Sequence, residues 1–256
     1  MRLLLIALFG CHADEVRAPA SELTPALEPL SWTLGDWQTD QNSQHWIAAG
    51  GAIYSVTLAQ GSFGIVMIDD GVGTGSADGV LRLFAIPDGM KQIEENVQLG
   101  KQSASFTHEG ETITFKREGD TLIAGAVTYK RAKREPAPEL EAADRAFAAD
   151  VAKRGVDGLV AAFDPKGGMI RRGQRIEGAG IDEFMRPLLT RGKLAWDPIA
   201  SGKRGDLGFT IGKGTYTGAT PADSWQSSYV TIWHQQSDAS WKVLFDGGRP
   251  MQKPAR

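Results

Sequence analysis

The 256-residue chain has little of the residues that most often reveal a protein's chemistry. Cysteine occurs once, at Cys11, so no disulfide can form within the chain. The four histidines are scattered, whereas a metal site needs clustered His, Cys, Asp or Glu ligands. The pair Gly212 and Gly214 lies inside an expected strand without a following helix, which excludes a phosphate-binding loop there. We therefore expect no metal and no cofactor.

The chain also lacks a strong charge of either sign and a long hydrophobic run. Its formal net charge of −3 excludes the overall basic surface of a nucleic-acid-binding protein, so we expect no nucleic-acid partner. The apolar run at residues 3–10 is too short to cross a bilayer as a helix, which needs about 20 residues. This run does not predict a membrane-spanning helix.

The N-terminus does carry a recognisable pattern. Arg2 precedes the apolar run, and Gly10 and Cys11 follow it. This arrangement resembles the processing site of a bacterial lipoprotein, which implies that Cys11 becomes the acylated first residue of the mature protein. Residues 1–26 are then signal and tether, and the protein lies on the periplasmic face of a cell-envelope membrane. A cleaved signal without lipid and a chance cysteine remain alternatives, because the run is near the short end of a signal core.

Charge and proline indicate a boundary in the middle of the chain. Residues 28–130 hold 6 Lys and Arg against 13 Asp and Glu, while residues 139–256 hold 17 against 14. Between them, a basic cluster runs into Pro136 and Pro138, which cannot continue a strand or helix interior. We predict a linker at 135–138 between domains at 27–134 and 139–249, with a tail at 250–256.

The first predicted domain is rich in glycine and short alternating segments. Strands are expected at residues 52–58, 64–68, 81–86, 112–116 and 121–124, with a hairpin turn at 117–120. Strands at this spacing without a long helical pattern predict an all-β barrel or sandwich. Trp32, Gly35 and Trp37, with the later Trp46, resemble the entry of lipocalin-like barrels. That resemblance implies an interior that holds either the protein's own tryptophans or a small apolar ligand.

The second predicted domain has another organisation. Helices are expected at 140–155, 156–163 and 181–189, with Pro187 near the end of the third. Four antiparallel strands are expected at 194–201, 207–218, 227–236 and 241–247. Helices followed by a strand meander predict an α+β layer fold.

Three segments of this half, 205–212, 229–233 and 240–246, are similar to the SnoaL-like, or nuclear-transport-factor-2-like, superfamily. The resemblance implies a cone in which a curved sheet wraps around helices and leaves a cavity. It also implies a homodimer through the sheet. The superfamily includes isomerases, dehydratases and non-catalytic binding modules, so the fold alone cannot decide the function.

The sequence leaves more than one candidate for a catalytic residue. The ketosteroid isomerase-like base is missing, because Met169 to Arg172 occupy its expected segment and Asp164 comes too early. The remaining catalytic candidates are Asp246, which could instead cap a strand end, and His234, a lone histidine.

Ligand contacts are predicted for three residues. Arg171 could hold an anion at the mouth of the cone, or it could flank a strand in solvent. Tyr229 and Trp233 could line the interior, although a place in the core or at a dimer face explains Trp233 better. Three functions remain open. The first is a lipoprotein that binds a small apolar or amphipathic molecule without catalysis. The second is a dimerisation or interaction module, and the third is an isomerase- or dehydratase-like enzyme.

Overall fold

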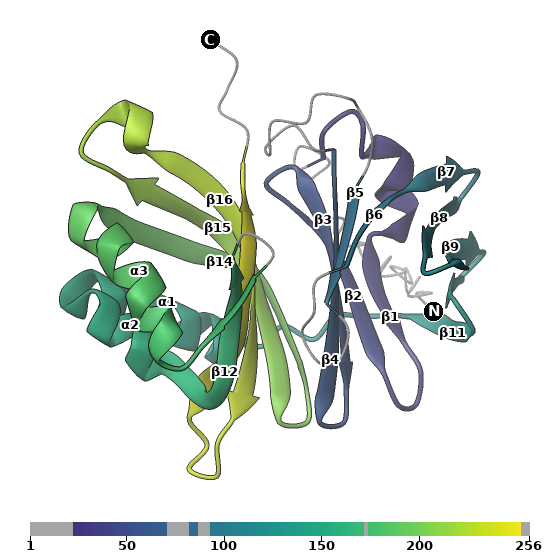
Figure 1. Cartoon of the computed structure of the whole chain (residues 1–256). Coiled ribbons are helices and arrows are strands. Elements are labelled where there is room, and N and C mark those ends of the chain that lie inside the picture. Colours follow the sequence, from purple (N-terminus) through teal and green to yellow (C-terminus); the bar gives the residue numbers. More distant parts are fainter. Residues whose placement is uncertain (1–22, 71–81, 87–92, 172–173, 252–256) are drawn as a thin grey trace, which may run out of the picture.

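The computed structural model describes residues 23–70, 82–86, 93–171 and 174–251. Cys11 and its predicted acylation lie outside the described residues. Figure 1 shows a layer of helices, then two sheets that face each other, then the remaining strands of the first sheet. In the described part of the chain, no helix is long and apolar enough to cross a membrane.

The N-terminal half forms one sheet of 11 strands in the order β6-β5-β4-β3-β2-β1-β11-β10-β9-β8-β7. Within this sheet each strand pairs with a neighbour in sequence, and β1 also pairs with β11. A short 3-10 helix, η2 (Glu28–Thr33), precedes the first strand. The strands are β1 (Gly35–Gln38), β2 (Ser43–Ala49), β3 (Ala52–Ala59), β4 (Ser62–Asp69), β5 (Arg82–Ile86), β6 (Ile93–Asn96), β7 (Gln98–Gly100), β8 (Ser103–His108), β9 (Glu111–Glu118), β10 (Thr121–Ala124) and β11 (Val127–Ala132).

Alternation along β2 and β3 separates two apolar clusters. Trp46 and Ile53 face the interior of the N-terminal sheet, where they pack with Leu30 of η2 and Phe115 of β9. The neighbouring Tyr54 faces the other way, toward the C-terminal half. Successive side chains of a strand point to opposite faces, so both faces of β2 and β3 are buried. Of the three tryptophans expected in the core, Trp37 and Trp46 are buried, and Trp32 is partly buried against the same cluster.

The C-terminal half contains three helices and a six-stranded sheet in the order β13-β12-β17-β16-β15-β14. Its helices are α1 (Pro138–Arg154), α2 (Val156–Ala162) and α3 (Ala179–Arg191), with a 3-10 turn η4 (Pro221–Asp223). Its strands are β12 (Phe163–Arg171), β13 (Gln174–Glu177), β14 (Lys193–Arg204), β15 (Leu207–Thr217), β16 (Trp225–Gln235) and β17 (Trp241–Pro250). The helices cover one face of the sheet, as Figure 1 shows, and this arrangement agrees with the predicted cone.

The C-terminal sheet differs from the sequence prediction. The sheet is not a simple antiparallel meander, because β12 and β13 join it and β12 pairs with β17 in parallel. Strand β12 was not predicted because it contains Pro165 and Gly167, and both residue types disfavour a regular strand. The β12–β17 register shifts between Phe163 and Gly168, which accommodates them.

The two sheets pack face to face and share one apolar cluster. From the N-terminal sheet it includes Ile47, Tyr54 and Val56, and from the C-terminal sheet Phe209 and Ile232. The face of the C-terminal sheet away from the helices, through which dimerisation was expected, is therefore in contact with β2, β3 and β4. A homodimer formed through that face would require the two sheets to separate.

Candidate functional site

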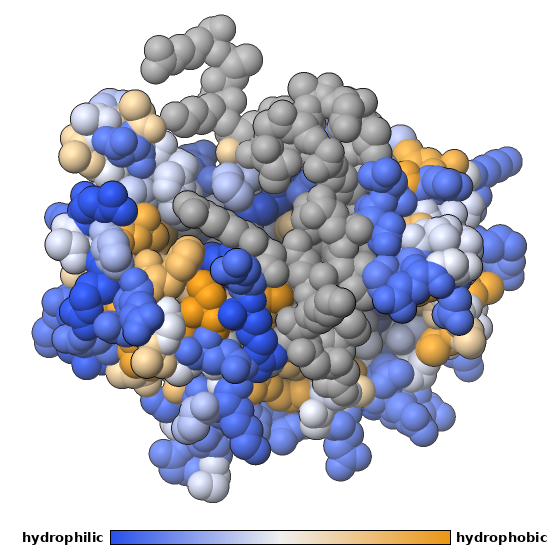
Figure 2. Space-filling view, in the orientation of Figure 1, coloured by the Kyte–Doolittle hydropathy of each residue, from blue (hydrophilic) through white to orange (hydrophobic). Residues whose placement is uncertain are grey.

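A cavity of about 630 Å³ lies between the helices and the C-terminal sheet. This volume falls within the range typical of small-molecule sites, roughly 300–1,000 Å³. Most of its lining is aromatic or aliphatic and includes Phe147, Leu159, Phe163, Met169, Met185 and Trp196. Figure 2 shows hydrophobic side chains set between hydrophilic ones on the helix-bearing half, at the left.

An ion pair forms the main polar feature of the cavity wall. Arg171, near the end of β12, pairs with Asp246 of β17, and both side chains line the cavity. Arg171 also donates to the backbone oxygens of Ile170 at 2.9 Å and Asp246 at 3.2 Å. The second carboxylate oxygen of Asp246 accepts from Thr231 Oγ1 at 3.2 Å. The charge of Arg171 is thus compensated within the protein, which disfavours the anion site predicted for it.

Deeper in the wall, Tyr229 is held by a fully buried carboxyl group. Asp144 of α1 accepts hydrogen bonds from Tyr229 Oη at 2.8 Å and from Trp196 Nε1 at 2.7 Å. Burial raises the pKa of Asp144, although its hydrogen-bond donors oppose that effect. Burial and the Asp144 charge raise the pKa of Tyr229, so its hydroxyl stays protonated and donates. A Cβ at Gly212 would lie 2.5 Å from Tyr229 Oη, so glycine provides the space for this contact.

Part of the cavity wall also contacts the N-terminal sheet. Ser228 and Arg249 both line the cavity. Ser228 Oγ lies 2.7 Å from Tyr54 Oη of β3. Arg249 is buried; it donates to the Gly51 carbonyl at 2.8 Å and lies 3.4 Å from an Asp69 carboxylate oxygen. The cavity wall is therefore continuous with the contact between the two sheets.

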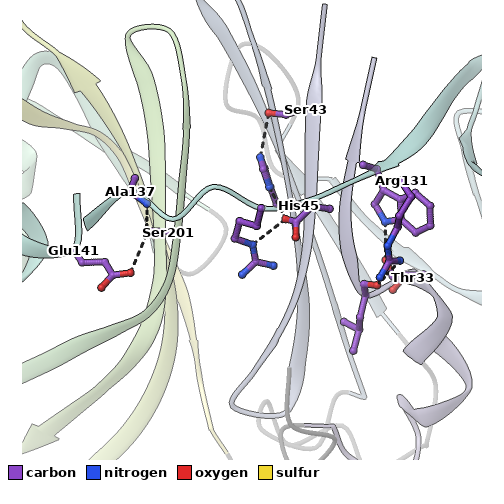
Figure 3. Close-up of polar contacts among 11 residues, drawn as sticks. Thr33, Ser43, His45, Arg131, Ala137, Glu141 and Ser201 are labelled. Carbon is purple, nitrogen blue, oxygen red and sulfur yellow. Dashed lines mark hydrogen bonds and ion pairs between the residues drawn. The ribbon is translucent and has the colours of Figure 1, made fainter. Parts of the chain in front are cut away.

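A second polar cluster fixes the segment that connects the halves. Asp36 of β1 accepts from Arg134 Nε at 2.9 Å and contacts His45 Nδ1 at 2.8 Å. Figure 3 shows His45 reaching Ser43, at 3.1 Å. Burial alone would raise the pKa of Asp36, but hydrogen bonds from His45 and Arg134 and the Arg134 charge lower it below its usual value. These contacts hold the start of the connecting segment against β1.

The other end of that segment is held by the C-terminal half. Ala137 N donates to Ser201 Oγ of β14 at 3.0 Å, and Ser201 Oγ in turn donates to Glu141 of α1 at 2.9 Å (Figure 3). Pro138 is already the first residue of α1. The predicted linker at 135–138 is thus a short connection that both halves hold.

The cavity brings together three of the predicted site residues, Arg171, Tyr229 and Asp246. The side chain of Asp246 lies within β17 and faces the cavity, so it does not cap the strand end. Trp233 does not line the cavity. It is buried in the helix–sheet core, where it donates to Thr210 Oγ1 at 2.9 Å.

His234 lies away from the cavity, and its Nδ1 is 2.9 Å from Asp164. Asp144 was not among the residues predicted for the site. The sequence did contain a sign of its burial. Asp144 places a carboxylate within the apolar helix face formed by Leu140, Phe147 and Val151. The described residues contain no group of three or more His, Cys, Asp or Glu side chains placed to hold a metal ion.

Comparison with known proteins gives similarity in fold to part of the chain. No protein-family description and no curated protein matches it. A ketosteroid isomerase-like protein from Erwinia carotovora atroseptica is 13% identical, with a TM-score of 0.39 over 44% of this chain and 94% of its own. An NTF2-like protein with a cystatin-like fold from Novosphingobium aromaticivorans is 13% identical, with a TM-score of 0.38 over 46% and 83%. An NTF2-like protein of unknown function from Pseudomonas putida is 12% identical, with a TM-score of 0.37 over 44% and 88%.

Proposed function

We propose that this protein binds a small, uncharged amphipathic molecule in the cavity of its C-terminal half, without catalysis. The observation that carries this proposal is the largely apolar cavity of about 630 Å³, in whose wall Arg171 pairs with Asp246. Of the other two arginines in the lining, Arg249 lies 3.4 Å from Asp69, and Arg191 donates to the Pro187 carbonyl at 3.0 Å. The apolar lining favours a hydrophobic body, and the polar wall favours a hydroxyl or carbonyl on the ligand. A ligand carboxylate would compete with Asp246 for Arg171 and leave a largely buried charge unpaired, which is costly.

Two matched fluorescent probes test this proposal. N-phenyl-1-naphthylamine is neutral, and 1-anilinonaphthalene-8-sulfonate has the same ring system with an added anionic group. We expect saturable binding of the neutral probe, with energy transfer from Trp196 and Trp225 in the cavity wall. We expect weaker binding of the sulfonate. Equal or tighter binding of the sulfonate would refute an uncharged ligand.

A cavity-filling variant locates the binding. Leu188 lines the cavity, so Leu188→Trp should weaken binding of the neutral probe at least about tenfold, a loss of about 1.4 kcal/mol. Ile199 is exposed and is absent from the lining, so Ile199→Trp is the matched control and should bind normally. The proposal fails if the wild type shows no saturable binding, or if both variants bind like the wild type.

The isomerase- or dehydratase-like alternative has one favourable observation, because Asp246 faces the cavity beside polar partners. A carboxylate base must be free to accept a proton from the substrate. Both oxygens of Asp246 already accept contacts, one from Arg171 and one from Thr231. This arrangement favours binding over proton transfer.

We also propose that a lipid on Cys11 anchors the protein to a cell-envelope membrane. The support is the sequence pattern of Arg2, the apolar run and Gly10 before Cys11. Replacing Cys11 with Ser should move the protein from the membrane fraction to the soluble fraction of its bacterial host. Unchanged fractionation of the variant would contradict the lipid anchor, and loss of the membrane fraction would leave the cavity proposal untouched.

A further inference from the structure

Buried polar atoms without hydrogen-bond partners are concentrated in the N-terminal half. Within the described residues, Arg249 Nε is the atom of this kind in the C-terminal half, and it lies 3.4 Å from Asp69 in the ion pair between the sheets. The others all lie between residues 24 and 55; they are Thr24 Oγ1, Trp32 Nε1, Gln44 Oε1, Trp46 Nε1 and Ser55 Oγ. Buried polar groups are normally paired, so a cluster of exceptions needs an explanation.

Three of these atoms belong to side chains that share the inner face of β2 and β3. Trp46 is directly opposite Ser55 in the strand register, and Gln44 is two residues before Trp46 on the same face. Their exposed fractions are 4% for Gln44, 1% for Trp46 and 1% for Ser55. Trp46 packs edge-on against Phe115 across the sheet interior, with ring centroids 5.3 Å apart. These three residues form what we call the Trp46 niche.

The chemistry of the niche defines what it can hold. Trp46 Nε1 can only donate, Gln44 Oε1 can only accept, and Ser55 Oγ can do both. Gln44 Nε2 contacts Thr57 Oγ1 at 3.4 Å, which leaves Oε1 to face another partner. None of the three side chains is charged, so a charged ligand would lack a counter-charge among them.

We propose that the Trp46 niche binds one small, uncharged hydrogen-bonding group that accepts a hydrogen bond from Trp46, donates one to Gln44 and forms one with the Ser55 hydroxyl. A water molecule or the hydroxyl or amide of a small molecule has this chemistry. The niche is a binding site separate from the cavity of the C-terminal half. It would make the N-terminal sheet a ligand-holding structure as well as a packing partner.

Whether Ser55→Ala lowers or raises the Tm tests whether the Trp46 niche is occupied. If the niche is occupied, Ser55→Ala removes a satisfied hydroxyl and should lower the Tm of the full chain by roughly 2–4 °C. If the niche is empty, the same change removes an unpaired buried hydroxyl, and an unchanged or raised Tm overturns the proposal. Ser228→Ala is the matched control, because Ser228 is equally buried and its hydroxyl is paired with Tyr54. It should lower the Tm in either case.

Two measurements on the wild type identify the source of the group. A nuclear Overhauser effect between the Trp46 indole proton and water indicates a bound water molecule. A small molecule retained in native mass spectrometry, and lost from Ser55→Ala, indicates an organic ligand. Either result supports the proposal, and the absence of both overturns it even if Ser55→Ala fails to fold.

Discussion

At the residue scale, the carboxylate of Asp164 holds the chain where α2 passes into β12. Asp164 is the second residue of β12, just after α2, and it is only 7% exposed. It accepts from Lys166 N at 2.8 Å and Gln236 Nε2 at 2.9 Å, and it contacts His234 Nδ1 at 2.9 Å. Burial alone would raise the pKa of Asp164, but these hydrogen bonds lower it below its usual value. Asp164 thus has a structural role at the start of β12.

We expect Asp164→Asn to destabilise the protein at pH 7 by about 1–3 kcal/mol, because the variant loses charge-assisted hydrogen bonds. A carboxyl with a lowered folded-state pKa stabilises the fold above its unfolded pKa, which is about 3.9. That contribution disappears as the pH falls through the folded-state pKa. The difference between wild type and variant should therefore shrink below about pH 4 in chemical unfolding experiments.

Asp206→Asn is the control for this substitution. Asp206 also lies near His234, at 3.8 Å, but its side chain is 56% exposed. It should change the stability little at either pH. If Asp164→Asn lowers the free energy of unfolding equally at all pH values, the shape of the Asp164 side chain, and not its charge, explains its structural role.

At the scale of elements, the contact between α1 and α2 depends on the absence of a side chain. Gly155, with φ of 63°, ends α1 and turns the chain into α2. At Gly158 an added Cβ would lie 2.5 Å from the Asp150 carbonyl oxygen and 3.1 Å from Val151 N. Backbone atoms of a helix cannot move away easily, so glycine at 158 fixes how closely the helices approach.

Gly158→Ala should therefore destabilise the protein by about 1–3 kcal/mol, measured by thermal and urea unfolding. The higher helix propensity of alanine, worth about 1 kcal/mol, acts in the opposite direction and makes the test stringent. Gly180→Ala in α3 is the control, since its Cβ would meet the movable Ile176 Cγ2 at 3.3 Å. We expect Gly180→Ala to be neutral or stabilising. A stabilising Gly158→Ala would contradict the close approach of the backbones.

At the scale of the whole molecule, the apolar cluster shared by the two sheets couples the unfolding of one sheet to that of the other. Ile232 of β16 and Phe209 of β15 are fully buried in it with Tyr54 and Val56 of β3. The buried Arg249–Asp69 pair and the Tyr54–Ser228 contact add polar links across the same surface. Separating the sheets would expose all of these groups at once, so the halves should unfold together.

Ile232→Ala should cost about 2–5 kcal/mol and shift the unfolding of both halves equally. Hydrogen–deuterium exchange read separately from β2–β4 and β15–β17 would measure the two responses. The exposed Ile199→Ala should leave both sheets unchanged. Destabilisation confined to β15–β17, with β2–β4 unaffected, would show that the halves unfold independently.

The sequence by itself determined much of the local structure. Apolar periodicity placed all three helices, and alternation placed β3, β4, β9, β10 and β14 to β17 close to their observed bounds. Three residues named from the sequence as site candidates, Arg171, Tyr229 and Asp246, line the cavity, and their roles there remain predictions. The placement of the helices and strands depends on patterns within short segments, which the hydrophobic effect imposes on any helix or strand with one buried face.

The tertiary structure alone decided the rest. It paired Arg171 with Asp246, placed Asp144 against Tyr229, and set the N-terminal sheet against the face expected to dimerise. Each of these contacts joins segments far apart in the chain, and no local pattern encodes which partner a charge or an apolar face will meet. The physical reason is that a buried polar group must be paired, whatever the fold. Which partner it finds depends on which distant segments the fold brings together.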